Sequence, residues 1–140
     1  MAKKDSFQRE RLHRAARVGD VNEVERVLDQ GLNPNLFDEI GMTPLHYAAA
    51  GEHFDVVSLL LRRGARVNAH HEPTISNTAL SDVADRCSFR MARLLIDAGA
   101  DPTIQGWMQL TALDRAKGRG DEEGRKVYAL LKAAAKSRHR

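Results

Sequence analysis

His70, His71 and Glu72 are adjacent in this 140-residue chain, and they form its only cluster in which two histidines stand side by side, a residue type that commonly binds metals. Neighbouring side chains of an extended segment point to opposite sides, so the two imidazoles are poorly placed to share one ion. Zinc proteases instead carry two histidines four residues apart on a helix, and that spacing is absent here. The run therefore predicts a polar surface loop, and we expect neither a metal nor any other cofactor.

Cys87 is the only cysteine, and Arg86 and Arg90 on either side are placed to lower the pKa of its thiol. No sequence signature supplies a base for it, and the chain has no nucleophile elbow, phosphate-binding glycine loop or dinucleotide fingerprint. A lone cysteine closes no internal disulfide, which is typical of a reducing compartment, so we expect a cytoplasmic protein. A structural cysteine is favoured over a reactive one, and an enzyme is not expected.

The net charge is +3, from 22 Lys and Arg against 19 Asp and Glu. Basic residues gather near both ends of the chain, which favours an acidic partner or else serves the soluble outer faces of a repeat array. Nucleic-acid binding is a less favoured alternative, because base stacking requires aromatic residues along a basic groove and the chain has few. No apolar run approaches the ~18 residues of a membrane span, and the N-terminus has no secretion signal.

A block that begins at Thr43-Pro44-Leu45-His46 recurs along the chain, with counterparts at 12–16, 78–80 and 111–113. The period is near 33 residues, and a fixed period of this size dictates a repeat architecture. The block resembles the ankyrin repeat. This resemblance implies an all-α ankyrin repeat solenoid of four helix-turn-helix repeats with hairpin-like loops. We expect a single domain, residues 1–140, with units one to four at about 6–36, 37–69, 70–104 and 105–136.

The residues of unit two suit the ends of its helices. Thr43 is a good N-cap, Pro44 fits the first helical position, and Gly64 fits a left-handed position after a helix. In the ankyrin family the Thr and His side chains of the motif hydrogen-bond around the loop, and Thr43 and His46 match those positions.

Units two and three depart from the motif at a few positions. Unit three has Ser81 where the histidine belongs, so we expect it to lack the usual clasp. Glu52 in unit two and Cys87 in unit three stand between the paired helices, where Gly19 and Gly120 stand in the other units. Because glycine adopts a positive φ without steric cost, we expect strained or rearranged turns at these two residues.

In ankyrin proteins a partner usually meets the loop tips and the adjoining first helices, which together form a concave face. Gly41 suits the first tip, but Ser76 and Gln109 replace the turn glycine in the later two. The second loop is also longer, because Gly64 to Thr78 spans 14 positions against 12 from Gly31 to Thr43. The later tips are therefore expected to differ in shape. The candidate partner-binding residues are Glu39, Ile40, Met42, His70, His71, Ile75, Asn77, Asp85, Arg86, Trp107, Met108, Leu110 and Lys117.

Trp107, the only tryptophan, has two interpretations. With Met108 and Leu110 it has the composition of an interaction hot spot at a position that the family usually exposes. Alternatively, its ring folds back over the helices and covers the core. The sequence leaves both open.

By resemblance, the function is non-catalytic protein–protein interaction through the concave face and loop tips, as an adaptor or an inhibitor. An antitoxin or immunity-type inhibitor of a specific effector is the alternative. The chain resembles small free-standing ankyrin proteins of bacteria, so we expect a bacterial source. We also expect a monomer. The partner's identity does not follow from a fold.

Overall fold

The computed structural model describes residues 2–138, and the side chains of residues 10–138. Within this range the chain forms eight α-helices, two short 3-10 helices and no strand. The α-helices are α1 (Ala2–Val18), α2 (Val21–Asp29), α3 (Pro44–Ala50), α4 (Phe54–Arg62), α5 (Ala79–Val83), α6 (Phe89–Asp97), α7 (Ala112–Lys117) and α8 (Glu122–Arg138). The 3-10 helices are η1 (Glu72–Thr74) and η2 (Trp107–Gln109). The predicted all-α class is confirmed.

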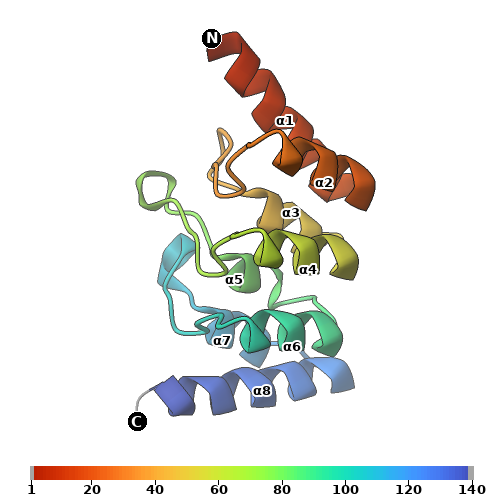
Figure 1. Ribbon diagram of the computed structural model, residues 1–140. Coiled ribbons are helices and arrows are strands. Elements are labelled where there is room, and N and C mark those ends of the chain that lie inside the picture. Colours follow the sequence, from red (N-terminus) through yellow and green to blue (C-terminus); the bar gives the residue numbers. More distant parts are fainter. Residues whose placement is uncertain (1, 139–140) are drawn as a thin grey trace.

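The helices pair within each unit and stack from one unit to the next (Figure 1). The first helices α1, α3, α5 and α7 pack on one another in succession, and each long connection to the next first helix projects from the same side of the stack. Second helices cover the other side of this column. This arrangement is the predicted solenoid of helix-turn-helix repeats.

Apolar residues at one repeat position form the centre of the core. Leu12, Leu45 and Leu80 lie on three successive first helices and are almost completely buried. Burying one such side chain contributes roughly 1.5–3 kcal/mol. Small residues such as Ala48 and Ala49 lie beside them, also buried, and their size lets the helices approach closely.

The connections that follow the second helices are held by asparagine side chains. Asn35 donates to the carbonyl of Gly64 at 3.0 Å and accepts from the amide of Arg66 at 2.7 Å. Asn68 makes the same pair of bonds one unit later, to Gly99 at 3.1 Å and Asp101 at 2.7 Å. Two-sided bonds of this kind satisfy backbone groups that no helix pairs. They also fix the spacing between neighbouring units.

Helix α1 extends further toward the N-terminus than the repeat pattern indicates. It runs from Ala2 without a break through Glu10 and Arg11, which stand where other units have an N-cap and a first helical residue. Neither residue type starts a helix as Thr and Pro do, so nothing at this point separates the helix from the residues before it. Residues 1 and 139–140 of the predicted domain lie outside the described part of the chain.

Candidate functional site

Three loops project from one side of the stack, and we call them finger one (residues 36–42), finger two (69–77) and finger three (104–110) (Figure 1). Large exposed apolar side chains concentrate at their tips. Among the described side chains, only Val18 belongs to this class outside the fingers; the others are Ile40, Ile75, Trp107, Met108 and Leu110. Each finger therefore presents at least one apolar side chain to solvent.

The exposure of the Trp107 side chain tests one of the two interpretations of the third tip. It is 57% exposed, and Met108 beside it is 71% exposed. The interpretation in which the indole covers the core is therefore wrong. Both side chains are free to contact a partner.

The tips differ in backbone conformation as predicted. Gly41 in finger one has φ 80°, which glycine adopts without strain. In the later fingers, non-glycine residues take the left-handed region: Ile75 (φ 51°), Met108 (φ 59°) and Gln109 (φ 59°). Such conformations cost of order 1–3 kcal/mol each and concentrate at functional sites. In both later fingers a strained residue carries an exposed apolar side chain.

Histidine side chains anchor fingers one and two to the helices behind them. His46 Nδ1 lies 3.1 Å from the amide of Thr43 and 2.8 Å from its hydroxyl, so the predicted clasp of unit two is confirmed. The amide donates to Nδ1, which leaves Nε2 as the nitrogen that donates to the carbonyl of Asn77, at 2.6 Å. His13 of unit one occupies the same repeat position, with Nε2 3.0 Å from the carbonyl of Met42 in finger one.

Finger three has no such anchor. Ser81 stands in place of the histidine on α5, is 1% exposed, and its hydroxyl has no hydrogen-bond partner. Its side chain is too short to reach as an imidazole does. The predicted lack of a clasp in unit three is therefore confirmed.

The fingers also contact one another. The rings of Phe37 and His71 lie 4.9 Å apart between fingers one and two. Asn77 of finger two accepts a hydrogen bond through Oδ1 from the amide of Trp107 in finger three, at 2.9 Å. His71 and Asn77, predicted as partner contacts, are half-buried and make this ring contact and this hydrogen bond within the protein. The predicted contact His70 is also half-buried, with Nδ1 3.0 Å from the carbonyl of Asn68.

A hollow of about 370 Å³ lies between finger one and the first helices, and sequence reasoning missed most of it. Only two of its lining residues were predicted, Glu39 and Ile40. The signal that was available is the spacing of Arg14 and Arg17, which places both on one face of a helix. The lining residues are Glu10, His13, Arg14, Arg17, Asp38, Glu39, Ile40 and Tyr47.

Asp38 and Tyr47 form a hydrogen-bonded pair in this hollow. Burial pushes the pKa of Asp38 upward, but hydrogen bonds from Tyr47 and from the amides of Met42 and Ile40 outweigh it and hold the pKa below its ordinary value. Burial, followed by the bond to Asp38, raises the pKa of Tyr47 to about 12. The pair shapes finger one, and the phenol remains the donor even in mildly alkaline solution.

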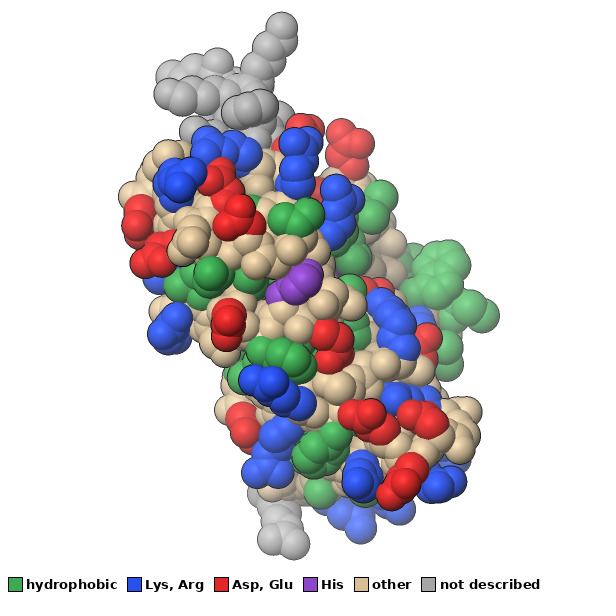
Figure 2. Space-filling view, turned by 90° about the vertical axis from the view of Figure 1, so that its right-hand side faces the viewer, with side chains coloured by type: hydrophobic (Ala, Val, Ile, Leu, Met, Phe, Trp, Pro, Cys, Tyr) green, Lys and Arg blue, Asp and Glu red, His purple; other side chains and the backbone are tan. Residues whose placement is uncertain are grey.

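The helix-end residues of the predicted surface carry charges of both signs. Asp85 and Arg86 are exposed and pair with each other at 3.1 Å, while Lys117 is exposed on α7. Acidic and basic side chains also alternate on the face shown in Figure 2, without a large patch of one sign. Met42, the remaining predicted contact, is half-buried at the base of finger one.

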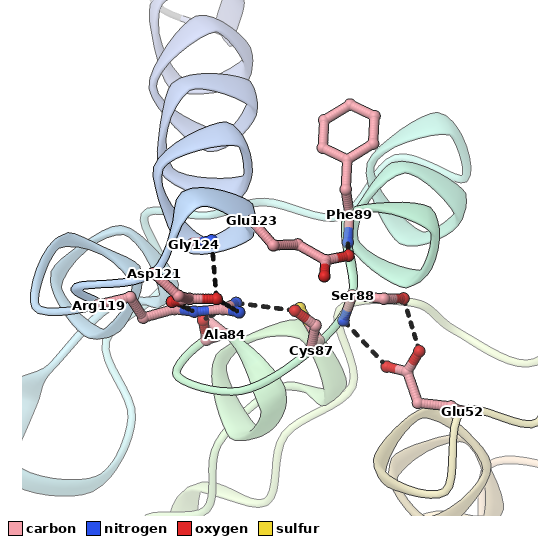
Figure 3. Close-up of polar contacts among 9 residues, drawn as sticks. All are labelled: Glu52, Ala84, Cys87, Ser88, Phe89, Arg119, Asp121, Glu123 and Gly124. Atoms are coloured by element: carbon pink, nitrogen blue, oxygen red, sulfur yellow. Dashed lines mark hydrogen bonds and ion pairs between the residues drawn. The ribbon is translucent and has the colours of Figure 1, made fainter.

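The thiol of Cys87 is not activated by its flanking arginines. The arginine that bonds to this residue is Arg119 of unit four, which donates to the Cys87 carbonyl (Figure 3). Burial raises the pKa of the thiol to about 11, although Arg119 acts in the opposite direction. Arg86 pairs with Asp85, and Arg90 lies over the ring of Phe54 at 3.9 Å. Neither flanking arginine lowers the pKa, because both side chains point to other partners. The buried thiol agrees with the structural cysteine that the sequence favoured.

The two predicted turn distortions are both present. Glu52 has φ 59°, a strained value for any residue other than glycine. The turn at Cys87 is rearranged, because α5 ends at Val83 after five residues, whereas α3 has seven. Within residues 10–138, no group of three or more His, Cys, Asp or Glu side chains is placed to hold a metal ion, and no helix of the described part is long and apolar enough to cross a membrane.

Comparison with known proteins finds ankyrin repeats in the family model and in each of the relatives below. The family model for ankyrin repeats (three copies) matches residues 12–106. Among curated proteins, the chain is 40% identical over 91 residues, 65% of its length, to the ankyrin repeat and KH domain-containing protein mask-1 of Caenorhabditis elegans. It is 36% identical over 97 residues, 68% of its length, to the ankyrin repeat, SAM and basic leucine zipper domain-containing protein 1 of Equus caballus. It is also 44% identical over 59 residues, 41% of its length, to human ankyrin repeat domain-containing protein 40.

The matched segments are small parts of these relatives. They span 3%, 20% and 16% of the three proteins, in the same order. All three proteins come from animals, and the bacterial source expected from the sequence stays a prediction.

Proposed function

Because the chain belongs to the ankyrin repeat family, whose members are generally non-catalytic protein–protein interaction modules, we propose that it binds a protein partner through the tips of its three fingers and the adjoining concave face. The observation that carries this proposal is the placement of exposed apolar side chains. Five of the six large ones among the described side chains lie on the fingers, from Ile40 to Leu110. Apolar clusters of this kind on a protein surface mark interaction sites.

The strained tips support the same conclusion. Ile75 is β-branched, and a left-handed conformation is unfavourable for such a residue. Glycine would adopt this conformation without steric cost, so the isoleucine is better explained by what its exposed side chain contacts.

We also propose that the partner presents acidic groups beside the apolar contact. Arg14, Arg17 and Lys117 are exposed, and none of them forms an ion pair with another described side chain. Unpaired cations near an apolar surface favour encounter with an acidic protein. The protein would act by occupying this partner as an adaptor or an inhibitor, as a monomer, in a reducing compartment such as the cytoplasm where the free thiol of Cys87 persists. Inhibition of a specific effector, as by an antitoxin, is the narrower form of this proposal.

The test is capture of the partner by immobilised protein, comparing the wild type with Trp107→Ala combined with Met108→Ala. Because both side chains are exposed, their truncation removes contacts at the surface without opening the core, so the melting temperature should change by less than about 2 °C. Retention of the partner should fall at least tenfold, as expected when hot-spot side chains are lost.

Val18→Ala is the matched control, since Val18 is equally exposed but lies at the end of α1, outside the fingers. It should retain the partner like the wild type. Equal retention of the partner by the double variant would exclude the finger tips as the binding surface. Binding to a short nucleic acid that both proteins keep would instead support the nucleic-acid alternative.

A further inference from the structure

Each finger closes on a carbonyl at its last residue, and the donors to these carbonyls differ. The carbonyl of Met42 accepts from the amide of Asp38 at 2.8 Å and from His13 at 3.0 Å. The carbonyl of Asn77 accepts from His46. The carbonyl of Leu110 accepts from the amide of Gly106 at 3.0 Å, within its own finger. Finger three is therefore closed on itself but is not bonded to the helix behind it.

One hydrogen bond joins finger three to a neighbouring unit among the described residues. It runs from the amide of Trp107 to the side-chain oxygen of Asn77 in finger two. The main-chain carbonyl of the same Asn77 is held by the buried His46. Asn77 thus links the anchored finger to the unanchored one.

The close approach at Gly106 shows that this contact is tightly packed. A Cβ built on Gly106 would lie 2.2 Å from Asn77 Oδ1 and 3.0 Å from its Cα. Gly106 is itself buried, although the adjacent Trp107 side chain is exposed. The two fingers thus meet at the residue directly before the exposed Trp107.

We propose that Asn77 positions Trp107 on the partner-facing surface. It takes the place of the histidine anchor that finger three lacks. Fingers two and three then present Ile75, Trp107 and Met108 as one unit. The role of this unit in binding rests on the proposed function, whereas the restraint of Trp107 by Asn77 does not. Asn77 is accordingly a positioning residue in this proposal, and its predicted contact with a partner stays a prediction.

Trp107 is the only tryptophan, so its fluorescence reports on finger three alone in the intact protein. Asn77→Ala removes the side-chain oxygen that accepts from the Trp107 amide. The amplitude of the fast component in the anisotropy decay of Trp107 should therefore increase. Exchange of the Trp107 amide with solvent should accelerate by about fivefold, as expected for the loss of one modest hydrogen bond. Asn77→Asp keeps an oxygen at the same place and should behave like the wild type.

A second, independent variant restores the histidine anchor that finger three lacks. Ser81→His in the Asn77→Ala background supplies an imidazole at the position that His13 and His46 occupy in the earlier units, where it can donate to the carbonyl of Leu110. It should restore the slow anisotropy decay, whereas Ser81→Ala in the same background should not. Should Ser81→His fail to fold, as judged by circular dichroism, the comparison of Asn77→Ala with Asn77→Asp decides alone.

The proposal is overturned if Asn77→Ala shows the same anisotropy decay and the same exchange of the Trp107 amide as the wild type, even if partner capture is intact. Increased mobility in Asn77→Ala together with weaker capture supports it. Increased mobility with unchanged capture supports the restraint but contradicts the finger-tip site, so failure of the two proposals is distinguishable.

Discussion

At the scale of single residues, environment overrides the chemistry that a residue type suggests. Cys87 lies between two arginines in sequence, yet its side chain is 2% exposed, and the cation that faces it is Arg119, from another unit. Arg119 donates to the carbonyl of Cys87 at 2.7 Å and thereby supports the backbone of this turn. Cys87 is thus a packing residue in a turn.

The Cys87 thiol should be inert in the native protein. With a pKa of about 11, only about one thiol in a thousand is ionised at pH 8, and the thiolate is the reactive form. We expect no reaction with a thiol reagent such as DTNB at pH 8 over an hour, and one equivalent on unfolding in guanidinium chloride. Rapid labelling of the native protein at a rate typical of exposed cysteines would contradict the buried position.

At the scale of elements, the N-terminus of α6 in unit three is completed by residues of other units (Figure 3). The Glu52 carboxylate of unit two accepts from the hydroxyl of Ser88 at 2.5 Å and from its amide at 3.2 Å. Glu123 of unit four accepts from the amide of Phe89 at 2.8 Å. Carboxylates at the N-terminus of a helix satisfy free amides and interact favourably with the positive end of the helix dipole. Helix α6 is therefore stabilised by both of its neighbours.

Glu52 combines a backbone cost with a side-chain gain, and two substitutions separate them. Glu52→Ala loses the bonds to Ser88 and keeps the left-handed φ, so the free energy of unfolding should fall by about 1–3 kcal/mol. Glu52→Gly loses the same bonds but relieves the strained φ, which costs roughly 1–2 kcal/mol for other residues. Glycine should thus be the less harmful change in urea unfolding. A glycine variant less stable than the alanine variant would show that the strain is small.

The elements could be predicted where local chemistry defines them. Thr43, Pro44 and Gly64 indicate a helix start and a helix end by their own conformational preferences, and the structure confirms them. The contacts between fingers could not be predicted in this way. The bond between Asn77 and Trp107 joins residues 30 positions apart, and its existence depends on how the units stack. The same is true of the hollow, which requires finger one to lie against α1 and α3.

At the scale of the whole molecule, His46 links its own helix to the next finger. It is buried on α3, closes the start of its own helix through Thr43 and holds finger two through Asn77. Units one and two pack through α1 and α3, and units two and three through α3 and α5. A change in the charge of His46 therefore acts on the centre of the stack.

Burial lowers the pKa of His46 below its ordinary value of 6.5, which makes the stability of the protein depend on pH. Below pH 6.5 the unfolded chain binds a proton at this histidine, while the folded chain still excludes it. The contribution of His46 is thus fully present above pH 6.5 and is lost as the pH falls toward the folded pKa, with a slope of at most about 1.4 kcal/mol per pH unit.

Urea unfolding between pH 7.5 and pH 5 measures this loss, with His46→Gln as the reference because glutamine does not titrate. The difference in unfolding free energy between wild type and variant should shrink as the pH falls below 6.5, because only the wild type must exclude a proton. Other titrating groups act on both proteins and cancel in the difference. Parallel pH profiles for the two proteins would show that the His46 clasp persists when the imidazole is charged, and that its neutral form is not what holds unit two to finger two.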